Sequence, residues 1–126
     1  MMKDLIDILK RQINSAPMDK PRPESLDSLV AKCTGWSEAR LIFKNGRRET
    51  QMLKLIEEIG ELASSIAKSR SVADDIGDAL VVLNNLAIMS GLTLQECLAA
   101  AYADIKDRKG HINSAGVFIK AEETMR

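Results

Sequence analysis

The sequence has 126 residues, 45% of them hydrophobic, which is enough for one domain with a modest core and too few for two. Its 18 Lys and Arg residues balance its 18 Asp and Glu residues. Because the formal net charge is zero, no overall basic field favours nucleic acid as a partner, and no acidic excess indicates a solvated tail.

Composition and the spacing of apolar residues favour an all-α protein. Aromatic residues make up only 3% of the chain, whereas Leu, Ala, Ile, Glu and Lys recur at helical spacing. Residues 3–13 predict a short amphipathic helix, and Pro17, Pro21 and Pro23 then predict an extended arm. We therefore expect an N-terminal helix and Pro-rich arm over residues 1–23 and a single helical domain over residues 24–126.

The charge of the N-terminus and the use of cysteine predict the cellular compartment. The N-terminus carries charges throughout and does not resemble a signal peptide, so Cys33 and Cys97 are expected to be reduced, buried thiols in a cytoplasmic protein. The longest apolar run, residues 79–89, contains two asparagines and falls short of the ~20 residues needed to span a bilayer. No membrane partner is expected.

The domain begins with a helix that Ser25 or Asp27 caps and that runs past Trp36 toward Ile42, with Gly35 as a point where it bends or breaks. Trp36 is the only tryptophan. Two interpretations of it stay open: an anchor in a core or interface, or a flat wall against which a nucleobase stacks.

After a turn at Asn45-Gly46, a long helix is predicted over residues 48–69, and its two faces differ. A broad apolar arc and a polar stripe outside it run along the helix, and Glu57 lies beside the stripe. The arc comprises Leu53, Ile56, Ile59, Gly60, Ala63, Ile66 and Ala67, and the stripe comprises Gln51, Lys54, Glu58 and Glu61.

The next helix, capped by Ser71 and closed near Ser90-Gly91, is apolar in nearly every direction from residue 76 to 89, which predicts a buried helix. Asp74, Asp75 and Asp78 nevertheless share one sector of it, and Asn85 continues that stripe two turns on. Ionised carboxylates in a low-dielectric interior cost several kcal/mol each unless they are paired or bound to a cation. A divalent metal is therefore the simplest explanation.

A third core helix opens at a Thr93-x-x-Glu96 capping box and stops at Gly110, and its last turn carries the basic residues Lys106, Arg108 and Lys109. The tail after it is partly polar, with residues 117–119 as a small apolar anchor. No strand is predicted.

Two acidic pairs carry the chemistry. Glu58 and Glu61 are three residues apart, as are Asp75 and Asp78, so antiparallel packing of their helices would gather four carboxylates around one point. Oxygen ligands without patterned Cys or His suit Mg²⁺ or Mn²⁺, metals that commonly hold nucleotide phosphates. The alternative for the Glu cluster is a solvated helix face.

These residues also carry a family likeness. The runs KLIEEIGELASSIAKS, DDIGDALVVLNNLA and DIKDRKG, with the flanking GWSEAR and GVFIK, resemble the MazG-like all-α nucleoside triphosphate pyrophosphohydrolases, especially short phage and mobile-element members. The resemblance implies a helical bundle completed by oligomerisation, as a homodimer or homotetramer. It also implies Mg²⁺-dependent cleavage of nucleoside triphosphates between the α and β phosphates, with Mn²⁺ as a substitute for Mg²⁺.

Roles carried over from the family fall on matching positions. Glu58, Glu61, Asp75 and Asp78 would be the Mg²⁺ ligands, and Glu57 would orient or deprotonate the attacking water. Lys54, Lys106 and Lys109 would contact phosphates. Trp36 is not part of that family pattern and is a candidate for lining the base pocket by the stacking described above.

The chain departs from the family pattern at two positions: Asp75 stands where Glu is commoner, which leaves open whether Asp74 shares its role, and Asp104 stands where many members have Asn. Noncanonical nucleotides are one expected substrate class. The alternatives are a dUTP or dCTP specialist on the same scaffold and a noncatalytic assembly module that binds a structural cation.

Overall fold

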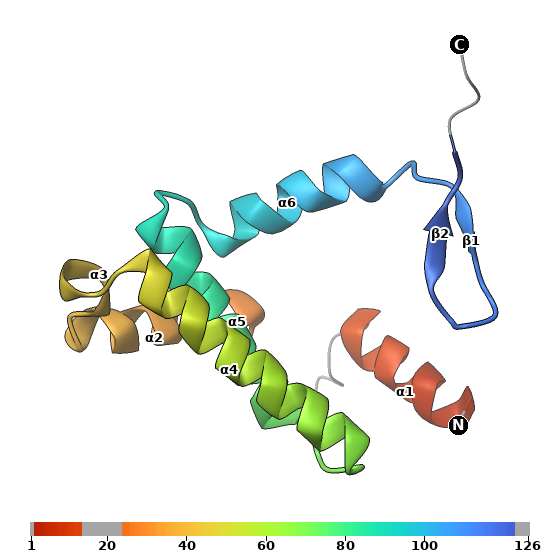
Figure 1. Cartoon of the computed structure of the whole chain (residues 1–126), viewed down its shortest axis with the longest axis horizontal. Helices are drawn as coiled ribbons and strands as arrows, with labels where there is room; N and C mark the ends of the chain where they lie inside the picture. The colour runs from red at the N-terminus through yellow and green to blue at the C-terminus, as the bar shows by residue number, and fades with distance from the viewer. Residues whose placement is uncertain (1, 14–23, 123–126) are drawn as a thin grey trace, which may run out of the picture.

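The computed structural model describes residues 2–13 and 24–122 (Figure 1). Helices make up most of it, followed by one short hairpin. The predicted arm at residues 14–23 lies outside the described residues, so the division at residue 23 stays a prediction. In chain order the elements are α1 (Met2–Ile13), α2 (Leu26–Ala39), α3 (Ile42–Asn45), α4 (Arg48–Ala67), α5 (Ala73–Met89), α6 (Leu94–Ile105), β1 (Gly110–Ile112) and β2 (Phe118–Lys120).

An antiparallel pair of helices, α4 and α5, forms the centre of the fold (Figure 1). Helices α2 and α3 pack on α5, and α6 contacts α5 near the turn between them and then extends away. Among the described residues, α1 contacts no other helix or strand. No single helix described here is long and apolar enough to cross a membrane; α5 and α6 meet that criterion jointly, by length and composition, as a pair bent by 96°.

Local capping signals set several helix ends. Ser25 accepts a hydrogen bond from the Ser28 amide at 3.1 Å, and Thr93 accepts one from the Glu96 amide at 3.0 Å, so both predicted N-caps are confirmed. The predicted cap of α5 is wrong, because α5 starts after Val72 without a side-chain cap. The break after α2 also falls elsewhere than at Gly35: Leu41 adopts a left-handed conformation, with φ of 62°.

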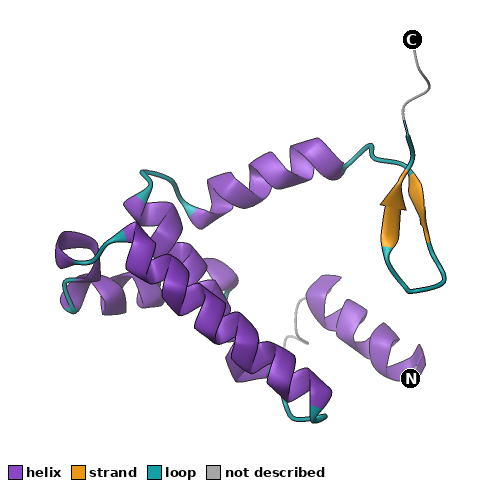
Figure 2. Ribbon diagram, in the orientation of Figure 1, coloured by secondary structure: helices purple, strands orange, loops and turns teal. Residues whose placement is uncertain are grey.

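A β-hairpin, which was not predicted, ends the described chain (Figure 2). The strands are antiparallel, with His111 opposite Ile119. The Asn113 side chain accepts hydrogen bonds from the amides of Ala115 at 2.9 Å and Val117 at 3.0 Å, and Gly116 takes a positive φ of 79°. An Asx-type turn with a glycine thus joins the two strands. Each strand has only three residues, too few to show the alternation of apolar and polar residues that predicts a strand.

Helix α4 packs on α5 with its more polar face. Its least exposed side chains recur every three or four residues, which is the spacing of one helix face. They include Gln51, Leu55, Glu58, Leu62 and Ser65. The predicted apolar arc lies on the other side and faces solvent in the single chain, with Leu53 65%, Ile56 57% and Ile66 63% exposed.

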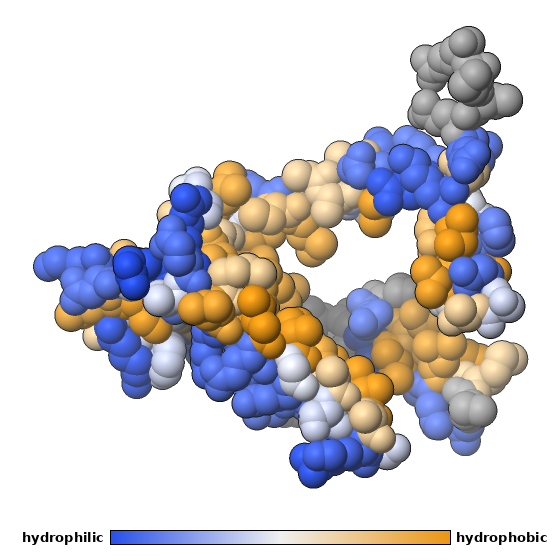
Figure 3. Space-filling model, viewed as in Figure 1, coloured by the Kyte–Doolittle hydropathy of each residue, from blue (hydrophilic) through white to orange (hydrophobic). Residues whose placement is uncertain are grey.

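The interior of one chain is consequently polar, while apolar side chains line its surface. Figure 3 shows an apolar stripe along α4 and further apolar groups on α6. Helix α5 is covered on one side only, because Ile76 is 45% and Leu80 43% exposed, so the helix predicted to be buried all round is half-covered. The buried residues among those described are Ser37, Glu58, Ser65, Ala79, Val82, Asn84, Asn85 and Ala87.

Candidate metal centre

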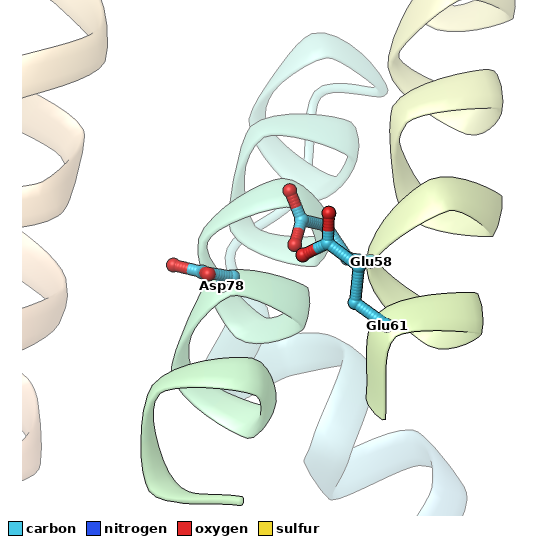
Figure 4. A group of neighbouring side chains, drawn as sticks. All are labelled: Glu58, Glu61 and Asp78. Atoms are coloured by element: carbon cyan, nitrogen blue, oxygen red, sulfur yellow. The ribbon is translucent and has the colours of Figure 1, made fainter. Parts of the chain in front are cut away.

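Three carboxylates meet between α4 and α5 (Figure 4). Glu58 and Glu61 project from one side of α4, one turn apart, and Asp78 projects from α5. One carboxylate oxygen from each lies within 4.8 Å of the others. The antiparallel packing expected from the sequence therefore brings together three of the four predicted ligands; we call these three residues the carboxylate cluster.

Glu58 is the buried member of the carboxylate cluster, with 6% of its surface exposed. Its Oε1 pairs with Lys54 Nζ at 3.1 Å, but its Oε2 is buried and has no hydrogen-bond partner among the described residues. A buried, unpartnered carboxylate oxygen is costly unless a cation binds it. This oxygen, beside two further carboxylates, fits a divalent metal with oxygen ligands.

The electrostatics point the same way. The charge of Glu58 raises the pKa of Glu61, and partial burial, followed by the charge of Asp74, raises the pKa of Asp78. The hydrogen bond to Glu58, followed by that to Glu57, raises the pKa of Lys54. Negative charge thus accumulates at the carboxylate cluster, with one lysine as its nearest counter-charge.

Two predicted residues lie beside the carboxylate cluster and outside it. Asp75 is half-buried on the first turn of α5, and its oxygens are not among those that converge. Glu57 is exposed and pairs with Lys54 Nζ at 3.3 Å. Their assigned roles, as fourth ligand and as partner of the attacking water, stay predictions.

The two predicted lysines after α6 lie away from the carboxylate cluster of the same chain. Lys106 caps the C-terminal end of α6, and Lys109 precedes β1. That end of α6 is well separated from α4 and α5 (Figure 1), and α6 contacts only α5 among the described elements. A phosphate at the carboxylate cluster would meet these lysines only if a second chain supplied them.

Trp36 lies at an open pocket of about 380 Å³ between α2 and α5. The ring is 49% exposed, so within one chain it is not a core anchor. The Arg40 guanidinium carbon lies 4.1 Å from the ring centroid, a cation–π contact that the sequence analysis missed although the i,i+4 spacing of the two residues indicates it. The pocket is lined by Lys32, Cys33, Trp36, Asp78 and Val81. Asp78 thus borders both this pocket and the carboxylate cluster.

Cys33 and Cys97 are free thiols in the structure, and each is only partly buried, so the prediction that both are buried is wrong.

Asn85 was predicted to continue the acidic stripe of α5, but its hydrogen-bond partners were not predicted. Asn85 accepts a hydrogen bond from Ser37 Oγ at 2.7 Å and donates one to Gln51 Oε1 at 3.1 Å. Adjacent Asn84 donates to Thr34 Oγ1 at 2.9 Å. Two consecutive amides within an apolar helix were the available signal, because amides inside such a helix need hydrogen-bond partners.

The fold and the carboxylate cluster define an all-α protein with an acidic site suited to a divalent cation. The MazG nucleotide pyrophosphohydrolase domain matches residues 47–113, which is more than half of the chain and spans α4, α5, α6 and β1. The chain therefore belongs to the MazG nucleotide pyrophosphohydrolase family.

Two phage proteins are similar to it. An uncharacterized 18.2 kDa protein from the rep-hol intergenic region of Haemophilus phage HP1 is 38% identical over 64 residues, covering 49% of this chain. The match covers 39% of that curated relative's length. The structure of a cyanophage S-2L MazG-like pyrophosphohydrolase, bound to dGDP and three catalytic Mn²⁺ ions per active site, matches with a TM-score of 0.60 and 24% identity. That match covers 79% of this chain and all of the cyanophage chain and supports the helical fold.

Proposed function

We propose that this protein is a divalent-cation-dependent pyrophosphohydrolase that cleaves nucleoside triphosphates between the α and β phosphates, releasing a nucleoside monophosphate and pyrophosphate. One observation carries the proposal: in a chain of the MazG family, three carboxylates converge and one buried oxygen, Glu58 Oε2, has no partner among the described residues. Phosphate chemistry suits such a site, because a cation held there offsets the charge of a polyphosphate.

The residues of the carboxylate cluster would hold the cation. Glu58, Glu61 and Asp78 converge, and Asp75, one turn before Asp78, is the proposed fourth ligand. When bound, the cation supplies positive charge against the phosphates and Lewis acidity toward water. We propose Mg²⁺ as the physiological ion with Mn²⁺ as a substitute, in line with the Mn²⁺ in the cyanophage structure.

Lys54 and Glu57 are the residues proposed to act on the substrate. The raised pKa of Lys54 keeps it protonated, and it lies next to the carboxylate cluster through its contact with Glu58. It would pair with a phosphate as negative charge develops on the leaving pyrophosphate. Glu57, freed from Lys54 by that exchange, would accept a proton from the attacking water.

The substrate is proposed to be a deoxynucleoside or nucleoside triphosphate, with removal of noncanonical nucleotides as the cellular role. The pocket beside Asp78 would receive the nucleoside, with Trp36 as a stacking wall. The dGDP of the cyanophage structure supports a nucleotide ligand. A specialist for dUTP or dCTP on this scaffold would use the same residues.

The active form is proposed to be a homodimer or homotetramer. The apolar arc of α4 points outward in the single chain, with Leu53, Ile56 and Ile66 more than half exposed. A contiguous exposed apolar face of this kind is typical of an interface between proteins. Covering it with a second copy would bury the face that the sequence predicts to be apolar.

The experiment is a panel of canonical and modified NTPs and dNTPs, assayed for pyrophosphate and monophosphate with Mg²⁺, with Mn²⁺ and with EDTA. We expect equimolar products that require the ion, and loss of turnover in Glu61→Gln with helicity unchanged, because Glu61 is exposed and its replacement leaves packing intact. Glu96→Gln, the same change at an exposed position of α6, is the matched control.

If a helical, folded protein hydrolysed no nucleotide of the panel, the proposal would be refuted. If Mg²⁺ then still raised the melting temperature, the carboxylate cluster would hold a structural cation, and the chain would be a noncatalytic assembly module.

A further inference from the structure

Two buried asparagines of α5 attach α2 to the rest of the fold. Asn84 and Asn85 are each 3% exposed. Asn84 donates to Thr34 Oγ1 of α2 at 2.9 Å, while Asn85 accepts from Ser37 Oγ of α2 at 2.7 Å and donates to Gln51 Oε1 of α4 at 3.1 Å. The Asn85 amide therefore joins three helices.

These bonds define the position of α2 more sharply than apolar packing does. The side chain of Ser37 is fully buried, and it is the buried residue of α2. Helix α2 contacts α5 and α3 but not α4 among the described elements. Apolar contacts tolerate small shifts, whereas a shift of α2 by one residue would leave the buried Ser37 and Asn85 groups unpaired, at a cost of the full desolvation of each.

The same bonds fix the distance between the pocket wall and the carboxylate cluster. Trp36 directly precedes Ser37 on α2, and Asp78 lies about two turns before Asn85 on α5. Gln51 lies about two turns before Glu58 on α4. Since Trp36 and Asp78 line one pocket, the Asn85 amide links the tryptophan wall to both helices that carry the carboxylates.

We propose that Asn85 is a positioning residue for nucleotide recognition: through Ser37 and Gln51 it holds α2 so that Trp36 meets the nucleoside while the phosphates lie at the carboxylate cluster. The inference rests on the proposed function and deepens it. Asn85 itself, at 3% exposure, contacts neither the cation nor the substrate in this arrangement.

The test uses variants of the full chain. Ser37→Ala removes the hydroxyl donor to Asn85, and Gln51→Met removes the acceptor at a half-buried position with a side chain of similar length. Gln51→Glu restores an acceptor and serves as the rescue variant. Ala87→Gly, at a buried position of α5 that makes no side-chain hydrogen bond, controls for loss of stability alone.

Three readouts separate positioning from structure. Because Trp36 is the only tryptophan, acrylamide quenching of its fluorescence reports the pocket without any need for turnover. The second readout is KM against kcat on the preferred nucleotide, below the melting temperature of every variant, and the third is stabilisation by MnCl₂.

We expect Ser37→Ala and Gln51→Met to increase the quenching of Trp36 and to raise KM roughly threefold to tenfold, the worth of one hydrogen bond, with kcat and the Mn²⁺ response unchanged. Gln51→Glu should return KM toward the parent value. Ala87→Gly should lower the melting temperature and move neither quenching nor KM.

If both hydrogen-bond variants lower only the melting temperature, Asn85 is a structural residue and the inference fails. If the parent protein hydrolyses no nucleotide, the proposed function fails separately. In that case the inference is tested with non-hydrolysable α,β-methylene analogues of the dNTPs, added with Mn²⁺. The measurement is whether they protect the fluorescence of Trp36 from quenching by acrylamide. Protection that Ser37→Ala weakens would support the inference, and absence of protection in the parent protein would overturn it.

Discussion

Replacing Asp78 by asparagine should raise the stability of the metal-free protein and abolish its response to metal. The substitution keeps the shape of the side chain and removes one of three negative charges that converge within 4.8 Å. Burial and the charges of Asp74, Glu58 and Asp75 already raise the pKa of this carboxyl, so its ionised form is disfavoured in the fold.

The magnitude follows from the geometry of Asp78 and Glu58. Two unit charges 4.8 Å apart repel by about 3.5 kcal/mol at an effective dielectric constant of 20 and by about 0.9 kcal/mol in water. Asp78 is only partly buried and Lys54 offsets part of the repulsion, so we take about 1 kcal/mol. That corresponds to a melting temperature about 4 °C higher for Asp78→Asn without metal.

Bound metal should make the parent protein more stable than Asp78→Asn, which reverses the order of their melting temperatures. At an Mn²⁺ concentration of about one hundred times Kd, the parent gains about 2.7 kcal/mol, or about 10 °C, which the variant lacks. Differential scanning calorimetry with EDTA and across an MnCl₂ series measures both, with Glu122→Gln, an exposed position after β2, as the control for charge alone. Parallel upward shifts of parent and variant with Mn²⁺ would refute the assignment of Asp78 as a ligand.

Three further outcomes are expected. Lys54→Met should lower kcat/KM about tenfold in the pyrophosphate-release assay, because a charge-assisted contact to phosphate is lost; an unchanged value would remove Lys54 from the site. Ile56→Glu places a charge on the exposed apolar arc of α4, the surface of the proposed oligomer interface, and should give a monomeric mass in light scattering where the parent gives a multiple of it; equal masses for the two proteins would contradict the proposed interface. Thr93→Ala removes the α6 cap, should cost about 1 kcal/mol and lower the melting temperature about 4 °C, and should leave metal binding intact; a changed Mn²⁺ response would contradict a purely local role.

Features that depend on neighbours in the sequence were predictable. The spacing of Glu58 and Glu61 follows from the helical repeat, and the caps at Ser25 and Thr93 use side chains that bond amides three residues away. The convergence of Asp78 with the glutamates needed one further step, the antiparallel pairing of two helices joined by a short turn.

Features that depend on which helix faces pack together were not predictable. A period of 3.6 shows that α4 has two faces, but it does not say that the face carrying Gln51 and Glu58 packs on α5. Lys106 and Lys109 are far from the carboxylate cluster because of the direction in which α6 leaves α5. The turn at Gly91 sets that direction, and the helical periodicity of the sequence does not reveal it.

The two faces of α4 explain why the contact between α4 and α5 is polar in so small a protein. Were the apolar arc of Leu53, Ile56 and Ile66 packed on α5, Glu58 would lie in solvent, where its carboxylate would bind a cation weakly and Lys54 would be screened. With the polar face inward, Glu58 is desolvated and its free oxygen favours a cation, at the cost of an exposed apolar surface. Assembly of several copies would offset that cost, so site and assembly depend on the same choice of face: a variant that turned α4 around should lose both together.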